Sequence, residues 1–217
     1  MNLTPPHVEK AKKLIQGIRL KGITDDRILN ALQHIPRHYF VEDRYKEAAY
    51  EDKPLPIGKE QTISQPFTVA YQTMLLDVQE GDKILEIGTG SGYQAAVLCE
   101  LGAKVFSIER YEHLHSRAKC VLQELSYTPQ LFFGDGYLGL PQYAPFDKIL
   151  ITAATDTIPE VLKKQLAMGG KMVLPLGSVY GQVMTVLRKV SKEEFQRTEH
   201  GGFVFVPMLK GVEKEAN

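Results

Sequence analysis

Cysteine and surplus charge are scarce in this sequence. Its 217 residues include only two isolated cysteines, Cys99 and Cys120, which suit neither a disulfide framework nor a zinc site. A reducing cytoplasm is therefore the expected location, and no metal site is expected. The 26 basic and 26 acidic residues cancel, so no electrostatic excess favours nucleic acid as a partner.

Long apolar runs are missing as well. No segment approaches the roughly 20 residues of a membrane span, and residues 1–10 lack the apolar core of a secretory signal. We therefore expect no membrane partner. Hydrophobic residues nevertheless make up 43% of the chain, which is enough for a sizeable core. The length suits a single domain over residues 1–217, which we expect to act as a monomer.

The chain divides into three expected parts. Residues 1–56 are predicted to form a helical segment, because apolar residues recur at helical spacing. Residues 57–177 are predicted to form an α/β core, and residues 178–217 to add antiparallel strands. Within the core, short apolar strands alternate with helices, a pattern typical of a parallel sheet with helices on both faces. The expected strands are 83–87, 104–108, 131–133, 147–151 and 171–174, followed by 182–190 and 202–207 with no helix between them.

A glycine-rich loop follows the first core strand. Gly88, Gly90 and Gly92 lie between this strand and the next helix, where ligands bind at the carboxyl ends of parallel strands. Glycines let the main chain turn sharply and approach a ligand closely. Glu109 ends the next strand about 20 residues later, where a carboxylate can accept hydrogen bonds from ribose hydroxyls. Together, the loop and the acid predict a nucleoside site.

The residues around the loop favour one nucleoside over another. A dinucleotide site needs a third small residue where the bulky Tyr93 stands. Glu86 precedes the loop, and its carboxylate would repel a pyrophosphate but suits a ligand with an ammonium group. S-adenosyl-L-methionine has that ammonium group and no phosphate. It is therefore the predicted cofactor, with S-adenosyl-L-homocysteine as its product, in preference to a nicotinamide cofactor.

Several segments resemble the protein-L-isoaspartate O-methyltransferase family over nearly the whole chain. The most specific is residues 57–66, which read IGKEQTISQP, and the glycine loop continues as LEIGTGSGYQAA over residues 85–96. The segments IPRHYFV (35–41), GDG (134–136), FDKI (146–149) and MGGKMVLPLG (168–177) follow the family's order. One departure is Glu60, which stands where many relatives have glycine.

The resemblance implies an activity and a set of site residues. The fold would be the class I, Rossmann-like methyltransferase sheet, and the reaction would be methylation of the free carboxylate of L-isoaspartyl, or also D-aspartyl, residues in damaged proteins and peptides. Succinimide closure of the ester would then begin repair. Ser64 would be the catalytic residue. The implied cofactor-binding residues are Gln61, Thr62, Ile63, Ser64, Glu86, Gly88, Gly90, Gly92, Glu109, Arg110, Asp135 and Gly136.

The expected chemistry needs little acid–base help. A carboxylate with a pKa of about 4 is already ionised at neutral pH, and a sulfonium is already an activated methyl donor. Ser64 is expected to hydrogen-bond the carboxylate and orient it. The competing interpretation of Ser64 is an ordinary helix or turn cap.

Recognition of varied peptides should depend on main-chain contacts. Val204, Phe205 and Val206 lie in a β-prone run, which could pair with an extended peptide or could be an ordinary core or edge strand. Other functions also stay open from the sequence. They are a methyltransferase of a small molecule or RNA, an inactive nucleoside-binding module, and a nicotinamide oxidoreductase, which Tyr93 and Glu86 disfavour.

Overall fold

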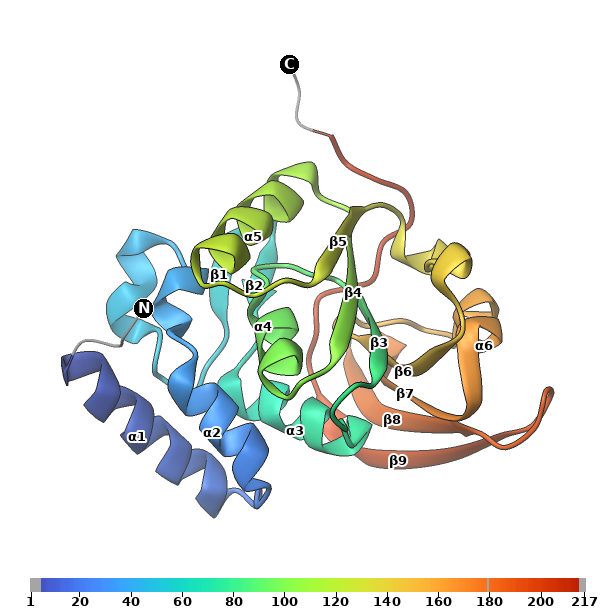
Figure 1. Cartoon of the computed structure of the whole chain (residues 1–217), viewed down its shortest axis with the longest axis horizontal. Coiled ribbons are helices and arrows are strands. Elements are labelled where there is room, and N and C mark those ends of the chain that lie inside the picture. Colours follow the sequence, from blue (N-terminus) through green and yellow to red (C-terminus); the bar gives the residue numbers. More distant parts are fainter. Residues whose placement is uncertain (1–4, 179, 215–217) are drawn as a thin grey trace.

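The computed structural model describes residues 5–178 and 180–214, and it begins with a helical segment. Helices α1 (Pro5–Leu20) and α2 (Asp26–His34) are followed by two short 3-10 helices, η1 (Arg37–Phe40) and η2 (Asp43–Ala48). Helix α2 starts at the N-cap Asp25, whose carboxylate accepts a hydrogen bond from the Arg27 amide. Figure 1 shows α1 and α2 at the opposite end of the molecule from α6.

The central sheet has seven strands in the order β5-β4-β3-β6-β7-β8-β9. The first five strands of the chain's α/β core run parallel, and the last two pair antiparallel at one edge. The predicted class of fold is therefore confirmed. The strands are β3 (Lys83–Ile87), β4 (Lys104–Glu109), β5 (Gln130–Phe133), β6 (Phe146–Ile151), β7 (Leu166–Ser178), β8 (Gly181–Lys189) and β9 (Phe195–Phe203).

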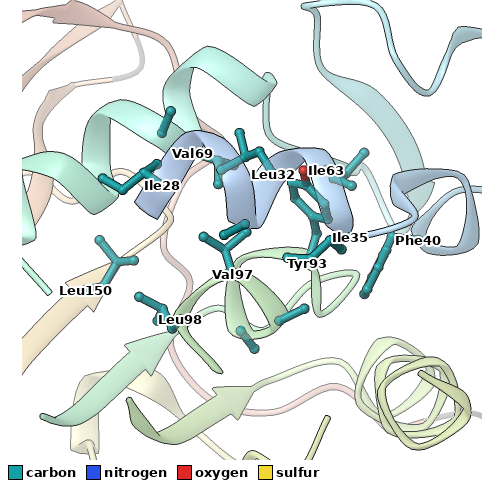
Figure 2. Packing of buried hydrophobic residues seen from close by; sticks show 14 of the residues in the cluster. Ile28, Leu32, Ile35, Phe40, Ile63, Val69, Tyr93, Val97, Leu98 and Leu150 are labelled. Atoms are coloured by element: carbon teal, nitrogen blue, oxygen red, sulfur yellow. The ribbon is translucent and has the colours of Figure 1, made fainter. Parts of the chain in front are cut away.

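Helices cover both faces of this sheet. Helices α3 (Pro66–Leu76), α4 (Tyr93–Glu100) and α5 (Glu112–Glu124) share one apolar cluster with α1 and α2, and α6 (Glu160–Gln165) belongs to a second cluster on the other face. Strand β3 contributes to both clusters because successive side chains point to opposite faces: Ile84 packs in the first and Leu85 in the second. In Figure 2, α2, α3 and α4 bring Leu32, Val69 and Val97 into the first cluster.

The last strand lies earlier in the chain than the sequence predicts. Strand β9 covers Phe195–Phe203, so the predicted strand 202–207 is wrong except for its first two residues. The reason is that β9 is an edge strand with mostly exposed, polar side chains, and its sequence lacks the apolar alternation of a half-buried strand. Residues 204–213 instead run back over the carboxyl ends of the parallel strands, where Ala154 exchanges main-chain hydrogen bonds with Val206 and Met208.

A two-stranded hairpin precedes α3. Strands β1 (Leu55–Gly58) and β2 (Gln61–Ile63) pair antiparallel. Lys59 and Glu60 form the turn, and both have left-handed backbone angles, with φ of 53° and 56°. This conformation favours glycine, which accounts for the glycine of many relatives where Glu60 stands. Elsewhere in the fold, no helix within the described residues is long and apolar enough to cross a membrane.

We predict that the N-terminal helices unfold together with the sheet as one domain. Leu32 is 1% exposed in the first cluster, so Leu32→Ala should lower the free energy of unfolding by about 2–5 kcal/mol. The matched control is Leu20→Ala, because Leu20 is 89% exposed and should change it by less than about 0.5 kcal/mol. Denaturant unfolding followed by circular dichroism and tyrosine fluorescence checks this. Two separate transitions, of which only one responds to Leu32→Ala, would contradict a single domain.

Candidate active site

Two cavities and a groove lie next to one another at the carboxyl ends of the parallel strands. We call them the distal cavity, the loop cavity and the groove. Their order follows from the residues they share. Gln61, Gly88, Glu109 and Ala153 line both the distal cavity and the loop cavity. Thr62, Ser64, Thr152 and Val206 line both the loop cavity and the groove.

The distal cavity is largely apolar. Ile87, Ile108 and Met208 contribute side chains to its wall, and Gly136 contributes main chain. Arg110 also lines it, while its guanidinium donates to the Gly211 carbonyl and lies 3.8 Å from the Glu213 carboxylate. Such a lining suits a flat, weakly polar ring such as adenine.

The loop cavity is lined by the main chain of the glycine loop. Gly88 has a φ of +96°, and a Cβ there would stand 2.5 Å from the Thr152 hydroxyl oxygen. That hydroxyl donates to the carbonyls of Ile87 and Gly88, which joins the ends of β3 and β6. The left-handed backbone angle and the close Thr152 hydroxyl both exclude a side chain at position 88. Gly90, Ser91, Gln94 and Ile63 complete the lining.

Glu109 lies at the boundary between the two cavities. One carboxylate oxygen accepts a hydrogen bond from the Gly90 amide at 2.8 Å, and the other accepts one from the Tyr111 amide at 2.9 Å. Burial raises the pKa of this carboxyl, and the two amides act in the opposite direction. Each oxygen keeps a lone pair, so the carboxylate can still accept hydrogen bonds from a diol.

Glu86 has a different environment. Its side chain is fully buried and accepts a hydrogen bond from Ser107, whose hydroxyl oxygen lies 2.6 Å from that of Thr89. The other Glu86 oxygen, Oε1, has no hydrogen-bond partner among the described residues. Burial raises the pKa of Glu86 to about 8. The buried Glu86 carboxyl is therefore connected to the glycine loop through the hydroxyl groups of Ser107 and Thr89.

The groove has a volume of about 770 Å³ and is open to solvent on one side. Its wall includes Phe67, Phe203 and Phe205, together with Val204 and Val206. The Phe205 amide donates to the Gln182 side chain, and Val204 is 86% exposed. All three residues expected to bind the peptide therefore line this groove.

Most of the expected cofactor residues line the two cavities, and three do not. Those lining them are Gln61, Thr62, Ile63, Ser64, Gly88, Gly90, Glu109, Arg110 and Gly136. Glu86 precedes Ile87 in β3, and since successive side chains of a strand alternate, it points to the opposite face from Ile87. Gly92 packs against Leu122, and the Asp135 carboxylate accepts hydrogen bonds from the amides of Tyr137 and Gly211. Direct contacts with the cofactor stay predictions for all twelve residues. No group of three or more metal-ligating side chains is found in the described part of the chain.

Other lining residues were missed from the sequence. Thr152 and Ala153 follow strand β6 and line the site, as do Pro207, Met208 and Leu209 of the C-terminal segment. A signal exists for Thr152, because it is the first residue after the fourth core strand and therefore lies at the ligand-binding edge of the sheet. No comparable signal marks residues 207–209, whose place depends on the path of the chain after β9.

Comparisons with known proteins agree with one another. The family described as protein-L-isoaspartate(D-aspartate) O-methyltransferase matches residues 9–213. Proteins named protein-L-isoaspartate O-methyltransferase from Christiangramia forsetii and Flavobacterium psychrophilum are 49% and 48% identical over 211 residues, which cover 97% of this chain and 99% of each relative.

Two solved structures bearing the same enzyme name are similar to the fold. One has a TM-score of 0.83 at 29% identity and covers 91% of this chain and 65% of its own. The other is a putative enzyme from Plasmodium falciparum in complex with S-adenosyl-L-homocysteine. It has a TM-score of 0.81 at 23% identity, and the match covers 92% of this chain and 98% of that structure's chain.

Glu86 predicts a pH dependence of stability. Its pKa of about 8 in the folded chain lies above the ordinary value of 4.5, so the folded state holds a proton that the unfolded state loses between these pH values. The free energy of unfolding should therefore fall as the pH rises from about 4.5 to about 8. Glu86→Gln should remove this component and be more stable than the wild type at pH 9, by at most about 5 kcal/mol at about 1.4 kcal/mol per pKa unit.

Thermal unfolding at pH 5 and pH 9 measures the effect. The exposed Glu80 supplies the control Glu80→Gln. If Glu86→Gln and the wild type show the same difference between the two pH values, the carboxyl does not titrate in this interval.

Proposed function

This chain belongs to the protein-L-isoaspartate(D-aspartate) O-methyltransferase family, and we propose that Ser64 orients the substrate carboxylate at the boundary between its cofactor cavities and its peptide groove. The protein is an S-adenosyl-L-methionine-dependent enzyme that methylates the free carboxylate of L-isoaspartyl residues in proteins and peptides. Activity on D-aspartyl residues, a monomeric state and a cytoplasmic location stay predictions.

The residues present fit the cofactor from end to end. The apolar distal cavity suits the adenine, and Glu109 stands where the ribose hydroxyls would lie. The glycine loop leaves room for the methionine end, since Gly88 and Gly90 bring only main chain to the wall. S-adenosyl-L-methionine, when bound, supplies an activated methyl group on its sulfonium. With the adenine in the distal cavity, the loop cavity would hold the sulfonium next to Ser64, which lines both this cavity and the groove.

Ser64 carries the proposal because it lines both the loop cavity and the groove. Its neutral hydroxyl can donate one hydrogen bond to a carboxylate that is already ionised, and no base has to remove a proton. A stronger ionic partner would stabilise the charge that the reaction removes. The nearby Thr152 hydroxyl already donates to main-chain carbonyls, so it is committed to holding the glycine loop. Positioning of this kind can supply roughly 7–11 kcal/mol of a barrier.

The groove supports recognition through the peptide main chain. Residues 202–206 form one side of it, with Phe67 and Phe205 as apolar contacts and little charge around them. Contacts to the main chain would tolerate the varied sequences in which isoaspartate arises. We therefore propose that the peptide runs along Val204, Phe205 and Val206.

The wild-type protein tests the function directly. It should transfer label from S-adenosyl-L-methionine to an isoaspartyl peptide and not to its aspartyl twin. The product should be a base-labile ester. Equal labelling of both peptides, or of neither, would exclude the function.

We predict that Glu109→Gln weakens cofactor binding more than peptide binding. Loss of the charge removes charge-assisted hydrogen bonds worth about 1.5–3 kcal/mol, or roughly 10- to 100-fold in the dissociation constant. Titration calorimetry with S-adenosyl-L-homocysteine measures it, with the exposed Glu124→Gln as control. A folded Glu109→Gln protein with wild-type affinity would remove this residue from the ribose site.

We predict that Ser64→Ala lowers kcat by roughly 10- to 100-fold, since one hydrogen bond to a charged group is lost. Some activity should persist, because Ser64 orients the carboxylate and is not a nucleophile. Thr62→Val is the matched control, since Thr62 lines the same boundary, and its effect should be smaller. A methylated Ser64 in the mass spectrum, or net retention at a chiral methyl group, would contradict direct transfer.

A further inference from the structure

Arg37 is a buried cation in the middle of the N-terminal segment. It is the largest of the fully buried side chains, with an exposed fraction of 0%. No ion pair of its guanidinium is found among residues 5–178 and 180–214, and the opposite charge that acts on it is the Asp52 carboxylate, which pairs with Lys21. Burial accordingly lowers the pKa of Arg37.

Two main-chain carbonyls and one ring hold the guanidinium. Nε donates to the Ala49 carbonyl at 2.8 Å, and Nη2 donates to the Ser64 carbonyl at 2.9 Å. The guanidinium carbon lies 4.7 Å from the centre of the Tyr93 ring, which also lines the loop cavity. Figure 2 shows Tyr93 reaching from α4 toward α2 and Ile63. One side chain thus connects three segments that meet at the active site.

Packing alone does not account for a charge at this position. Burying a cation without an opposite charge costs more than burying an apolar side chain of similar volume. Only part of this cost is offset by hydrogen bonds, because neither Nη1 of Arg37 nor the Tyr93 hydroxyl has a partner with full hydrogen-bond geometry within the described chain. The two groups do interact with each other, and Tyr93 thereby raises the pKa of Arg37 against the larger effect of burial.

The turn that carries Ser64 is also held by Asp52. Asp52 accepts a hydrogen bond from the Phe67 amide at 2.8 Å, and its carbonyl accepts one from the Gln65 side chain at 3.0 Å. Arg37 fixes the carbonyl of Ser64 itself. Fixing that peptide group restricts the backbone angle ψ of Ser64, and the backbone conformation in turn limits the rotamers open to the Ser64 side chain.

We propose that Arg37 is a positioning residue for the methyl transfer, which it supports by holding the Ser64 peptide group so that the hydroxyl faces the substrate carboxylate. This inference rests on the proposed role of Ser64. The planar fork of arginine reaches Ala49 and Ser64 at once, which a lysine ammonium on a flexible stem does not reproduce. A lysine would still place a cation near Tyr93 and leave the cofactor side largely intact.

A double-mutant cycle tests the inference. Arg37→Lys, Ser64→Ala and the double variant are compared with the wild type for kcat on the isoaspartyl peptide, per active site counted by calorimetry with S-adenosyl-L-homocysteine. Arg37→Lys should lower kcat about tenfold and change the dissociation constant of S-adenosyl-L-homocysteine less than about threefold. In the Ser64→Ala background the same change should lower kcat less than about twofold, because the group it positions is gone. The exposed Arg44→Lys is the control.

Several outcomes would overturn the inference. A double variant whose loss is the product of the two single losses would show that Arg37 does not act through Ser64. So would an unchanged kcat per active site in Arg37→Lys. If that variant does not fold, Arg37→Gln keeps one donor without the charge and enters the same cycle. A wild type that does not methylate the isoaspartyl peptide removes the proposed function and the inference together, whereas an active wild type with multiplying losses removes the inference alone.

Discussion

The hydrogen bond from the Gly90 amide to the Glu109 carboxylate joins the ends of two neighbouring parallel strands, and the rest of the site depends on it. It fixes the glycine loop against β4, while the Thr152 hydroxyl fixes the same loop against β6. The loop lies at the switch point of the sheet, where the strand order turns from β3 toward β4 on one side and β6 on the other. The main chain that lines the loop cavity is therefore held in place by both neighbouring strands.

The N-terminal segment supports this site by packing against the elements that carry it. Its helices belong to the same apolar cluster as α3 and α4. Its polar groups reach further, because Arg37 and Asp52 both bind main-chain groups between β2 and the start of α3, at Ser64 and at Phe67. The specific motif around Ser64 is thus supported by residues that lie far earlier in the sequence and do not touch either cavity.

The sequence predicts the local features well and the non-local ones poorly. The strand that ends at Ile87, the loop after it and the placement of Glu109 follow from apolar runs and glycine spacing, which are local. The direction of the Glu86 side chain also follows from strand periodicity. Its place just before the glycine loop nevertheless favours the interpretation of Glu86 as a cofactor ligand. Strand β9 was misplaced because an exposed edge strand has no buried face to impose an alternation. Arg37 lies in the family-like segment 35–41, but nothing in that segment indicates a contact with Ser64, which is 27 residues away.

The C-terminal segment belongs to both binding regions. Residues 204–206 line the groove, and residues 207–209 line the distal cavity. Further along, Glu213 pairs with Lys59 of the hairpin turn at 3.0 Å, which ties the segment across the site. A displacement that widens the nucleoside end of the site therefore also moves a wall of the peptide groove. The release of the spent nucleoside and of the methylated peptide would thus be coupled, because one continuous stretch of main chain forms a wall of both regions.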